Sequence, residues 1–169
     1  MTRAQSFQAF LKCFSKESFP IALSDDNLPY FSSKNRPLSE ELIRRFILQG
    51  EKTEEIDEFT EFVPCCIIPD TKDIHAVVYW KGGLMNYEYL LTSYDKNGVV
   101  IDRKVIAGTK SDGQHVIQSV ATIDQDWVIH IVVGKQSINE KGYDPANSKS
   151  MSVELMPNGE LLFNMEESI

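Results

Sequence analysis

The sequence predicts an α+β fold in which two N-terminal helices pack on a mainly antiparallel sheet of about seven or eight strands. The residue pattern changes near position 62: the chain before it is helical and loop-like, and the chain after it is nearly all strand and turn. Asn-Gly, the strongest short-range hairpin signal, occurs at Asn97-Gly98 and at Asn158-Gly159. Short links favour antiparallel neighbours, because parallel strands need a long crossover. We therefore expect one domain over 1–169, helical at 1–61, with a meander sheet at 62–169 that can curl into a half-barrel.

The first helix is expected from about Arg3 to Ser15, with Thr2 as its N-cap. Its apolar residues recur at the spacing of one helical face: Phe7, Phe10, Leu11 and Phe14. The Phe19-Pro20 pair stops this helix, and a polar, proline-bearing loop is expected to follow as far as Pro37. Such an apolar stripe has to be covered, and the sheet is its natural partner.

The second helix is expected to begin after Ser39, a favourable N-cap. Glu40 and Glu41 complement the helix dipole in the first turn, and Gly50 stands where a glycine commonly ends a helix. The residues between them form one apolar face: Leu42, Ile43, Phe46 and Ile47.

The strands are expected in eight segments, each bounded by turn residues. These are Phe62–Ile68, Ile74–Lys81, Tyr87–Tyr94, Val99–Ala107, His115–Ile123, Trp127–Val133, Met151–Met156 and Glu160–Asn164. The interval from Gly108 to Gly113 is expected to be an ordinary connection between strands. The longest interruption, Gly134 to Lys149, is polar and is the best candidate for a functional loop.

The chain is acidic, with a formal net charge of −8 and a pI of about 4.9. This balance disfavours nucleic acid and anionic membranes as partners, because both are bound through basic patches. It suits a basic protein partner through electrostatic steering, although ordinary solubility would also explain it. No apolar run approaches the roughly 20 residues of a membrane helix, and the N-terminus does not resemble a signal peptide. Together with an odd number of cysteines, three, this favours a reducing, cytoplasmic location.

The residues that commonly carry catalysis or metal binding do not form a known motif. The candidate ligands are Cys13, Cys65, Cys66, His75, His115 and His130, without CxxC, HxxxH or HExxH spacing. A Cys–His pair is formally available, but Cys65 and Cys66 lie in an apolar run where burial would suppress thiol reactivity. We expect no metal and no cofactor, and the absence of a catalytic motif weighs against an enzyme.

Two segments are candidate binding surfaces. The first is acidic and runs from Glu51 to Glu61, with Glu54, Glu55, Asp57 and Glu58 as its proposed contacts. The second is a pair of strands carrying Tyr79, Trp80, Tyr87 and Tyr89. Aromatic residues of this kind anchor many protein interfaces, but cross-strand aromatic pairs are also ordinary features of a sheet.

The block from Tyr89 to Asp102 resembles a hairpin found in various small bacterial proteins of unknown role. It spans a small part of the chain and consists mostly of turn chemistry. The resemblance therefore implies no named family and no functional residue.

These observations favour a non-enzymatic protein-binding domain, most sharply an acidic inhibitor or immunity-type protein that neutralises a basic partner. The alternative is a small-molecule-binding or enzymatic domain with a site in the concave face of the sheet. That site would be lined by Tyr79, Tyr87, Tyr89 and His115. A third possibility is a subunit that self-associates through an edge strand, since the sequence leaves the oligomeric state open.

Overall fold

The computed structural model describes residues 2–49, 57–84, 86–137 and 148–165. Its helices are α1 (Arg3–Leu11), α2 (Leu28–Lys34) and α3 (Glu40–Leu42), with a 3-10 turn η1 (Asp25–Asn27) and a π-helical segment η2 (Ile43–Ile47). Its strands are β1 (Ser15–Lys16), β2 (Ile21–Leu23), β3 (Glu61–Ile67), β4 (His75–Gly82), β5 (Asn86–Tyr94), β6 (Val100–Ser111), β7 (His115–Ile123), β8 (Val128–Ser137), β9 (Lys149–Leu155) and β10 (Leu161–Met165).

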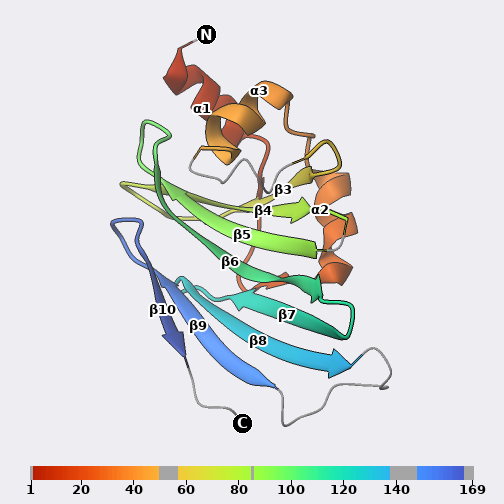
Figure 1. Ribbon diagram of the computed structural model, residues 1–169. Coiled ribbons are helices and arrows are strands. Elements are labelled where there is room, and N and C mark those ends of the chain that lie inside the picture. The colour runs from red at the N-terminus through yellow and green to blue at the C-terminus, as the bar shows by residue number, and fades with distance from the viewer. Residues whose placement is uncertain (1, 50–56, 85, 138–147, 166–169) are drawn as a thin grey trace.

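The ten strands form one mostly antiparallel sheet in the order β1-β3-β4-β5-β6-β7-β8-β9-β10, with β2 paired to β7 (Figure 1). From β3 onwards each strand pairs with its neighbour along the chain, so the expected antiparallel meander is confirmed. The short turns explain this order, because they leave a strand no other neighbour within reach. The parallel pair is β1 with β3, in which Ser15 lies beside Cys66.

The N-terminal part holds more structure than the sequence suggested. The expected polar loop contains β2, η1 and the helix α2, and the sheet has ten strands rather than seven or eight. Helix α2 covers the edge of β3: the side-chain amide of Asn35 donates to the carbonyl oxygens of Pro64 at 2.8 Å and Cys65 at 2.7 Å. Tertiary contacts of this kind stabilise a short helix that propensity alone does not reveal.

The two expected helices are present but shorter than predicted. Thr2 caps α1 through a capping box with Gln5, and the helix ends at Leu11 rather than Ser15. Ser39 caps α3, accepting from the amide of Leu42 at 3.2 Å, but the helix then widens into η2. Gly50, expected to end this helix, lies outside the described residues.

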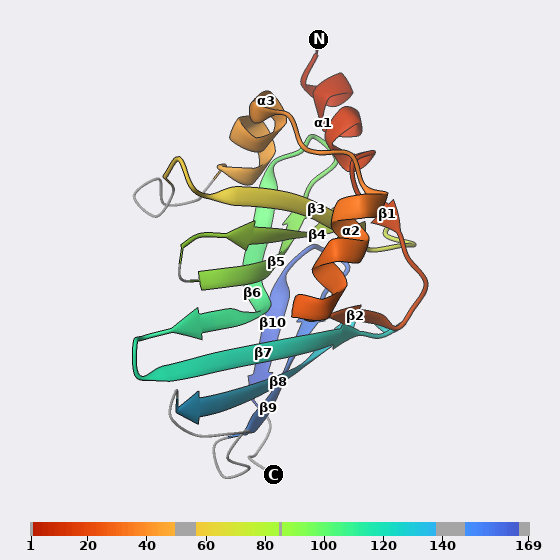
Figure 2. The same cartoon turned by 90° about the vertical axis from the view of Figure 1, so that its right-hand side faces the viewer.

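Two apolar clusters lie on the opposite faces of β3 to β5, as strand alternation requires. One cluster joins the sheet to α1 and the α3–η2 segment, and its buried members include Phe7, Phe10, Phe46, Val77 and Tyr79. The other, larger cluster includes Val78, Leu91, Ile123, Val153 and Leu161. Figure 2 shows α1 and α3 together at one end of the molecule, with α2 beside the sheet between β3 and β2.

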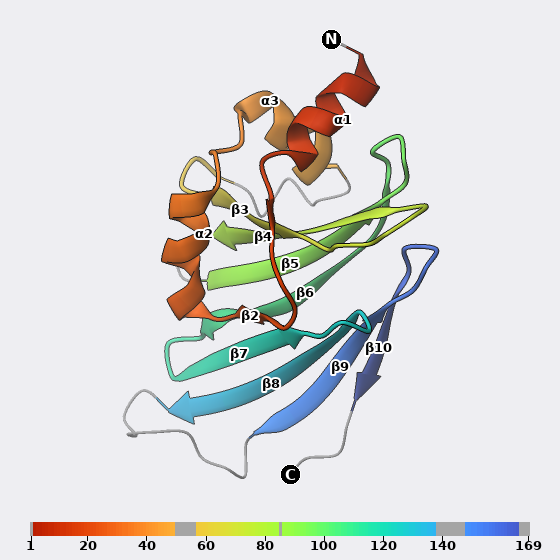
Figure 3. The same cartoon turned by 180° about the vertical axis from the view of Figure 1, so that it is seen from behind.

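The sheet curls but does not close. Strands β6 and β7 pair only over Gly108–Ser111, and β2 takes the place beside the far end of β7. At the other side the β9–β10 hairpin returns to β5 and β6, where the Ser93 hydroxyl donates to the Gly159 carbonyl (Figure 3). The amide of Leu161 also donates to Asp102 Oδ2 at 2.9 Å. The larger core fills the space that this curvature encloses.

The segment from Gly108 to Ser111 is strand, which corrects the expected connection. Gly108 has a φ of +155° and lies so close to Tyr87 that an added Cβ would stand 2.2 Å from its carbonyl oxygen. A glycine is required where two backbones approach this closely, which explains a residue that otherwise suggested a turn. None of the described helices has the length and apolar character needed to cross a bilayer.

Candidate protein-binding surface

The described part of the acidic segment forms a tight turn that leads into β3. The amide of Asp57 donates to Thr60 Oγ1 at 3.1 Å, and Asp57 Oδ1 accepts from the amide of Phe59 at 2.8 Å. Asp57 and Glu58 are both exposed, as the sequence suggested, and Phe59 is 58% exposed. The other two proposed contacts, Glu54 and Glu55, lie outside the described residues.

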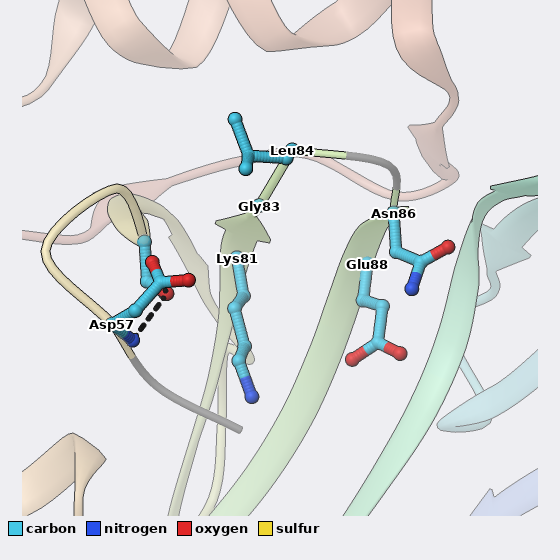
Figure 4. A pocket seen from close by; sticks show the side chains of 7 residues that line it. Asp57, Lys81, Gly83, Leu84, Asn86 and Glu88 are labelled. Atoms are coloured by element: carbon cyan, nitrogen blue, oxygen red, sulfur yellow. Dashed lines mark hydrogen bonds between the residues drawn. The ribbon is translucent and has the colours of Figure 1, made fainter. Parts of the chain in front are cut away.

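A pocket of about 200 Å³ lies beside this turn. Its lining residues come from the turn and from the two strands that flank the β4–β5 connection: Asp57, Thr60, Lys81, Gly83, Leu84, Asn86 and Glu88. Figure 4 shows the side chains of Lys81 and Glu88 next to each other, with Leu84 on the connection above them. Leu84 is 73% exposed, the largest value among the exposed large apolar side chains of the described residues.

The charged residues that line this pocket are of both signs: Asp57, Glu88 and Lys81. Lys81 and Glu88 are cross-strand partners on β4 and β5. Glu88 also pairs with Lys110 of β6, whose Nζ lies 3.5 Å from Glu88 Oε1. Lys110 is exposed and Glu88 is partly buried, and an ion pair at the surface of this kind contributes little to stability. These residues place charged groups near an exposed leucine, and protein interfaces commonly combine an apolar centre with a polar rim.

The expected aromatic surface does not form as a whole. Tyr79, Trp80 and Tyr89 are buried, and only Tyr87 among the four proposed residues is exposed, at 40%. The Tyr89 hydroxyl donates to the Ser24 carbonyl at 2.7 Å, so β5 is tied to the segment before η1. The ring of Tyr87 stacks on Trp80, with centroids 5.6 Å apart. The pattern misled because strands covered on both faces direct their aromatic residues into core rather than toward solvent.

The alternative site in the concave face loses its proposed lining. Tyr79 belongs to the cluster under α1, whereas Tyr89 belongs to the cluster enclosed by the curled sheet. The two side chains therefore point to opposite faces and cannot line one cavity. His115 begins β7 and lies opposite Ser137 of β8.

The thiols of β3 are buried, as their apolar neighbours indicated. Burial raises the pKa of Cys66 far above its ordinary value, with a smaller contribution from the charge of Glu17. Burial likewise raises the pKa of Cys65, reinforced by the neighbouring Cys66. A thiol whose pKa is raised holds its proton at neutral pH and is a poor nucleophile.

The three histidines lie apart from one another. His75 packs edge-on against Phe7, with centroids 5.6 Å apart, and burial lowers its pKa. It pairs with Tyr94 at one end of β5, while His115 lies past the other end of the β5–β6 ladder. His130 Nε2 lies 2.8 Å from Asp124 Oδ2. Among the described residues no three His, Cys, Asp or Glu side chains gather as a metal site would require.

A second pocket, of about 380 Å³, was not anticipated from the sequence. It is lined by Ser24, Asp25, Asp26, Gln118, Val120, Val132, Gly134 and Ser148. Two sequence signals touched it: the adjacent pair Asp25-Asp26, and the predicted functional loop from Gly134 to Lys149, of which Gly134 and Ser148 line the pocket. Strand β8 continues to Ser137, and residues 138–147 of that loop lie outside the described residues. The other lining residues come from strands distant in the chain. Topology brings them together, and no local pattern could have done so.

Comparison of the chain with protein-family models, curated proteins and solved structures finds no match.

Proposed function

We propose that this protein is a non-enzymatic protein-binding domain that neutralises a basic partner, in the manner of an acidic inhibitor or immunity protein. The observation that carries the proposal is the surface made by the Asp57–Thr60 turn and the β4–β5 connection. We call it the acidic rim surface and define it by Asp57, Glu58, Phe59, Leu84 and Glu88.

The acidic rim surface combines the two elements that a protein interface uses. Phe59 on the turn and Leu84 on the β4–β5 connection expose large apolar side chains, and exposed apolar side chains rimmed by polar residues are typical of interaction sites. Full burial of such a side chain contributes roughly 1.5–3 kcal/mol to an association. The turn adds the exposed carboxylates of Asp57 and Glu58, and β5 adds the partly buried Glu88; these charges favour a basic partner.

The net charge of −8 supports the same partner. A strongly acidic protein attracts a basic one over a distance of about one Debye length, roughly 8 Å at physiological ionic strength. Steering raises the association rate, while the apolar contacts oppose dissociation. An inhibitor that must reach a toxic or regulatory protein quickly benefits from both.

The proposal is tested by affinity capture from the source organism with the wild type and two matched variants as baits. The first variant carries Phe59→Ser and Leu84→Ser, which remove the apolar anchors. The control bait carries Tyr30→Ser, which removes an exposed aromatic (49% exposed) outside this surface. We expect one basic protein to be retained by the wild type and by the control but lost from the double variant. Retention by all three baits, or an acidic protein as the specific partner, would contradict the proposal.

A further inference from the structure

The second pocket and the acidic rim surface lie toward the same edge of the sheet, but Glu88 points to the opposite face of the sheet from the pocket. Tyr87 of β5 pairs with Thr109 of β6, and Thr109 pairs with Gln118 of β7, which lines the pocket. Figure 2 shows the end of β4, the β6–β7 turn and the end of β8 on the same side of the molecule. Two neighbouring strand steps therefore connect Tyr87 to the pocket, whereas the side chain of Glu88, the next residue of β5, points to the other face.

The floor of this pocket is apolar and its wall is acidic. Val120 and Val132 are direct cross-strand partners and are 39% and 48% exposed. Asp25 and Asp26 of η1 stand at the wall. A group that fits both has an aliphatic stem and a positively charged head.

The carboxylate of Asp25 is held in place from the sheet. Its Oδ2 accepts from Thr109 Oγ1 at 3.1 Å and from Gln118 Nε2 at 3.2 Å. Because two strands fix its orientation, this carboxylate can receive a ligand without first being ordered. A carboxylate has about four lone-pair sites, so these two bonds leave it able to accept more.

The lysines of the adjoining strands do not neutralise the wall. Lys135 follows Gly134 on β8 and pairs with Ile117, and Lys149 on β9 pairs with Val133. Side chains alternate along a strand, so both lysines belong to the face opposite Val132 and Gly134. The described lining residues contain two carboxylates and no cation.

We propose that this pocket receives an arginine side chain of the basic partner. Its aliphatic stem would lie on Val120 and Val132, and its guanidinium would bond the carboxylates of Asp25 and Asp26. A planar guanidinium suits this site better than an ammonium, because it donates several parallel bonds and is more weakly hydrated. The inference rests on the proposed function and names the side chain that the partner presents at this edge of the sheet.

The inference is tested without the partner, by titrating the protein with N-acetyl-arginine amide and following the methyl signals of Val120 and Val132 by NMR. The uncharged isostere N-acetyl-citrulline amide is the matched ligand control. We expect saturable shifts at both valines with the arginine probe and affinity at least about tenfold weaker for the citrulline probe, the loss expected when one charged contact is removed. Equal affinities, or shifts confined to residues around Asp57, would overturn the inference.

The matched protein variants are Asp26→Asn, which neutralises the pocket wall, and Asp73→Asn, which neutralises an exposed carboxylate in the β3–β4 connection. Affinity for the arginine probe should fall at least about fivefold in the first and stay unchanged in the second. Equal effects of the two substitutions would overturn the inference. It would also be overturned if NMR showed Val120 and Val132 in contact with another part of this chain and the arginine probe did not displace those contacts. Because the capture experiment tests Phe59 and Leu84, the two proposals can fail separately.

Discussion

The guanidinium of Arg103, on β6, donates a hydrogen bond from Nη2 to the carbonyl oxygen of Ile47 at 2.8 Å. Nη1 donates to the carbonyl of Gln49 at 2.8 Å, and Nε donates to Thr92 Oγ1 at 3.2 Å. Ile47 ends the η2 segment, and the carbonyl groups at a helix end have no hydrogen-bond donor in a following turn. Arg103 of the sheet supplies donors to the carbonyls of Ile47 and Gln49 instead. The positive charge also lies at the favourable, C-terminal end of the helical dipole.

Substitution Arg103→Met should therefore lower the free energy of unfolding by about 2–4 kcal/mol, because it removes charged donors from carbonyls at the helix end. Urea denaturation measures the change. The matched control is Lys104→Met at the next position, whose side chain lies on the opposite face of β6 and whose loss should cost less than about 0.5 kcal/mol. Equal losses of unfolding free energy in the two variants would contradict a specific role for Arg103 at the helix end.

Substitution by alanine should affect stability very differently at the two consecutive glycines, Gly82 and Gly83. A Cβ on Gly82 would stand 2.1 Å from the Trp80 ring, whereas a Cβ on Gly83 would meet nothing nearer than 3.8 Å. Gly82→Ala should displace the Trp80–Tyr87 stack and lower the free energy of unfolding by about 1–3 kcal/mol. Gly83→Ala should change it little. The midpoint temperatures of thermal unfolding of the two variants measure this difference, and equal midpoints would contradict the packing described for Trp80.

Stability should fall as the pH rises above 9. The ordinary pKa of a cysteine thiol is 9.0, and burial raises that of Cys66. Above pH 9 the unfolded chain releases this proton while the folded chain keeps it, so the folded state is stabilised below pH 9 and loses that advantage as the pH increases. Each buried thiol contributes a slope of about 1.4 kcal/mol per pH unit.

Urea titrations at several alkaline pH values measure this slope. Cys66→Val removes one titrating thiol and should reduce the slope, whereas Cys13→Ser removes a thiol that is only partly buried and should reduce it less. An unchanged slope in Cys66→Val would contradict the assignment to Cys66.

The rate of thiol labelling should follow the exposure of the three cysteines. Cys13 is partly exposed, whereas Cys65 and Cys66 are fully buried. A disulfide reagent at pH 8 should modify Cys13 in the folded protein and the other two only when the chain unfolds. The rate for Cys65 and Cys66 should increase with urea in step with unfolding, and rapid labelling of either in native buffer would contradict their burial.

Much of the sheet could be predicted from the sequence, because local signals determine it. Alternation, Asn-Gly turns and short links reveal all eight strands from β3 to β10 and their antiparallel sequence. Strand β2 and helix α2 could not be found in this way. β2 has three residues, and its pairing partner at Ile123 lies about a hundred positions away. Such a strand is determined by long-range pairing rather than by its own pattern.

The candidate surfaces show the same difference between local and long-range determinants. Asp57 and Glu58 are exposed as their charge indicated, and Tyr87 is exposed at the end of its strand. Tyr79 and Tyr89 are buried although the pattern favours a surface, because alternation does not reveal that both faces of β4 and β5 are covered. The pocket at Asp25 was missed because its walls come from η1, β7 and β8.

If the acidic rim surface binds a basic partner, the affinity should depend on salt, and this dependence can be measured directly. Calorimetry would give the Kd of the captured partner from about 50 to 500 mM salt, a range over which exposed charges become screened. We expect the Kd to rise at least about tenfold over this range, and to depend less on salt in the Asp57→Asn, Glu58→Gln double variant. A Kd that is unchanged across this range in the wild type would contradict it.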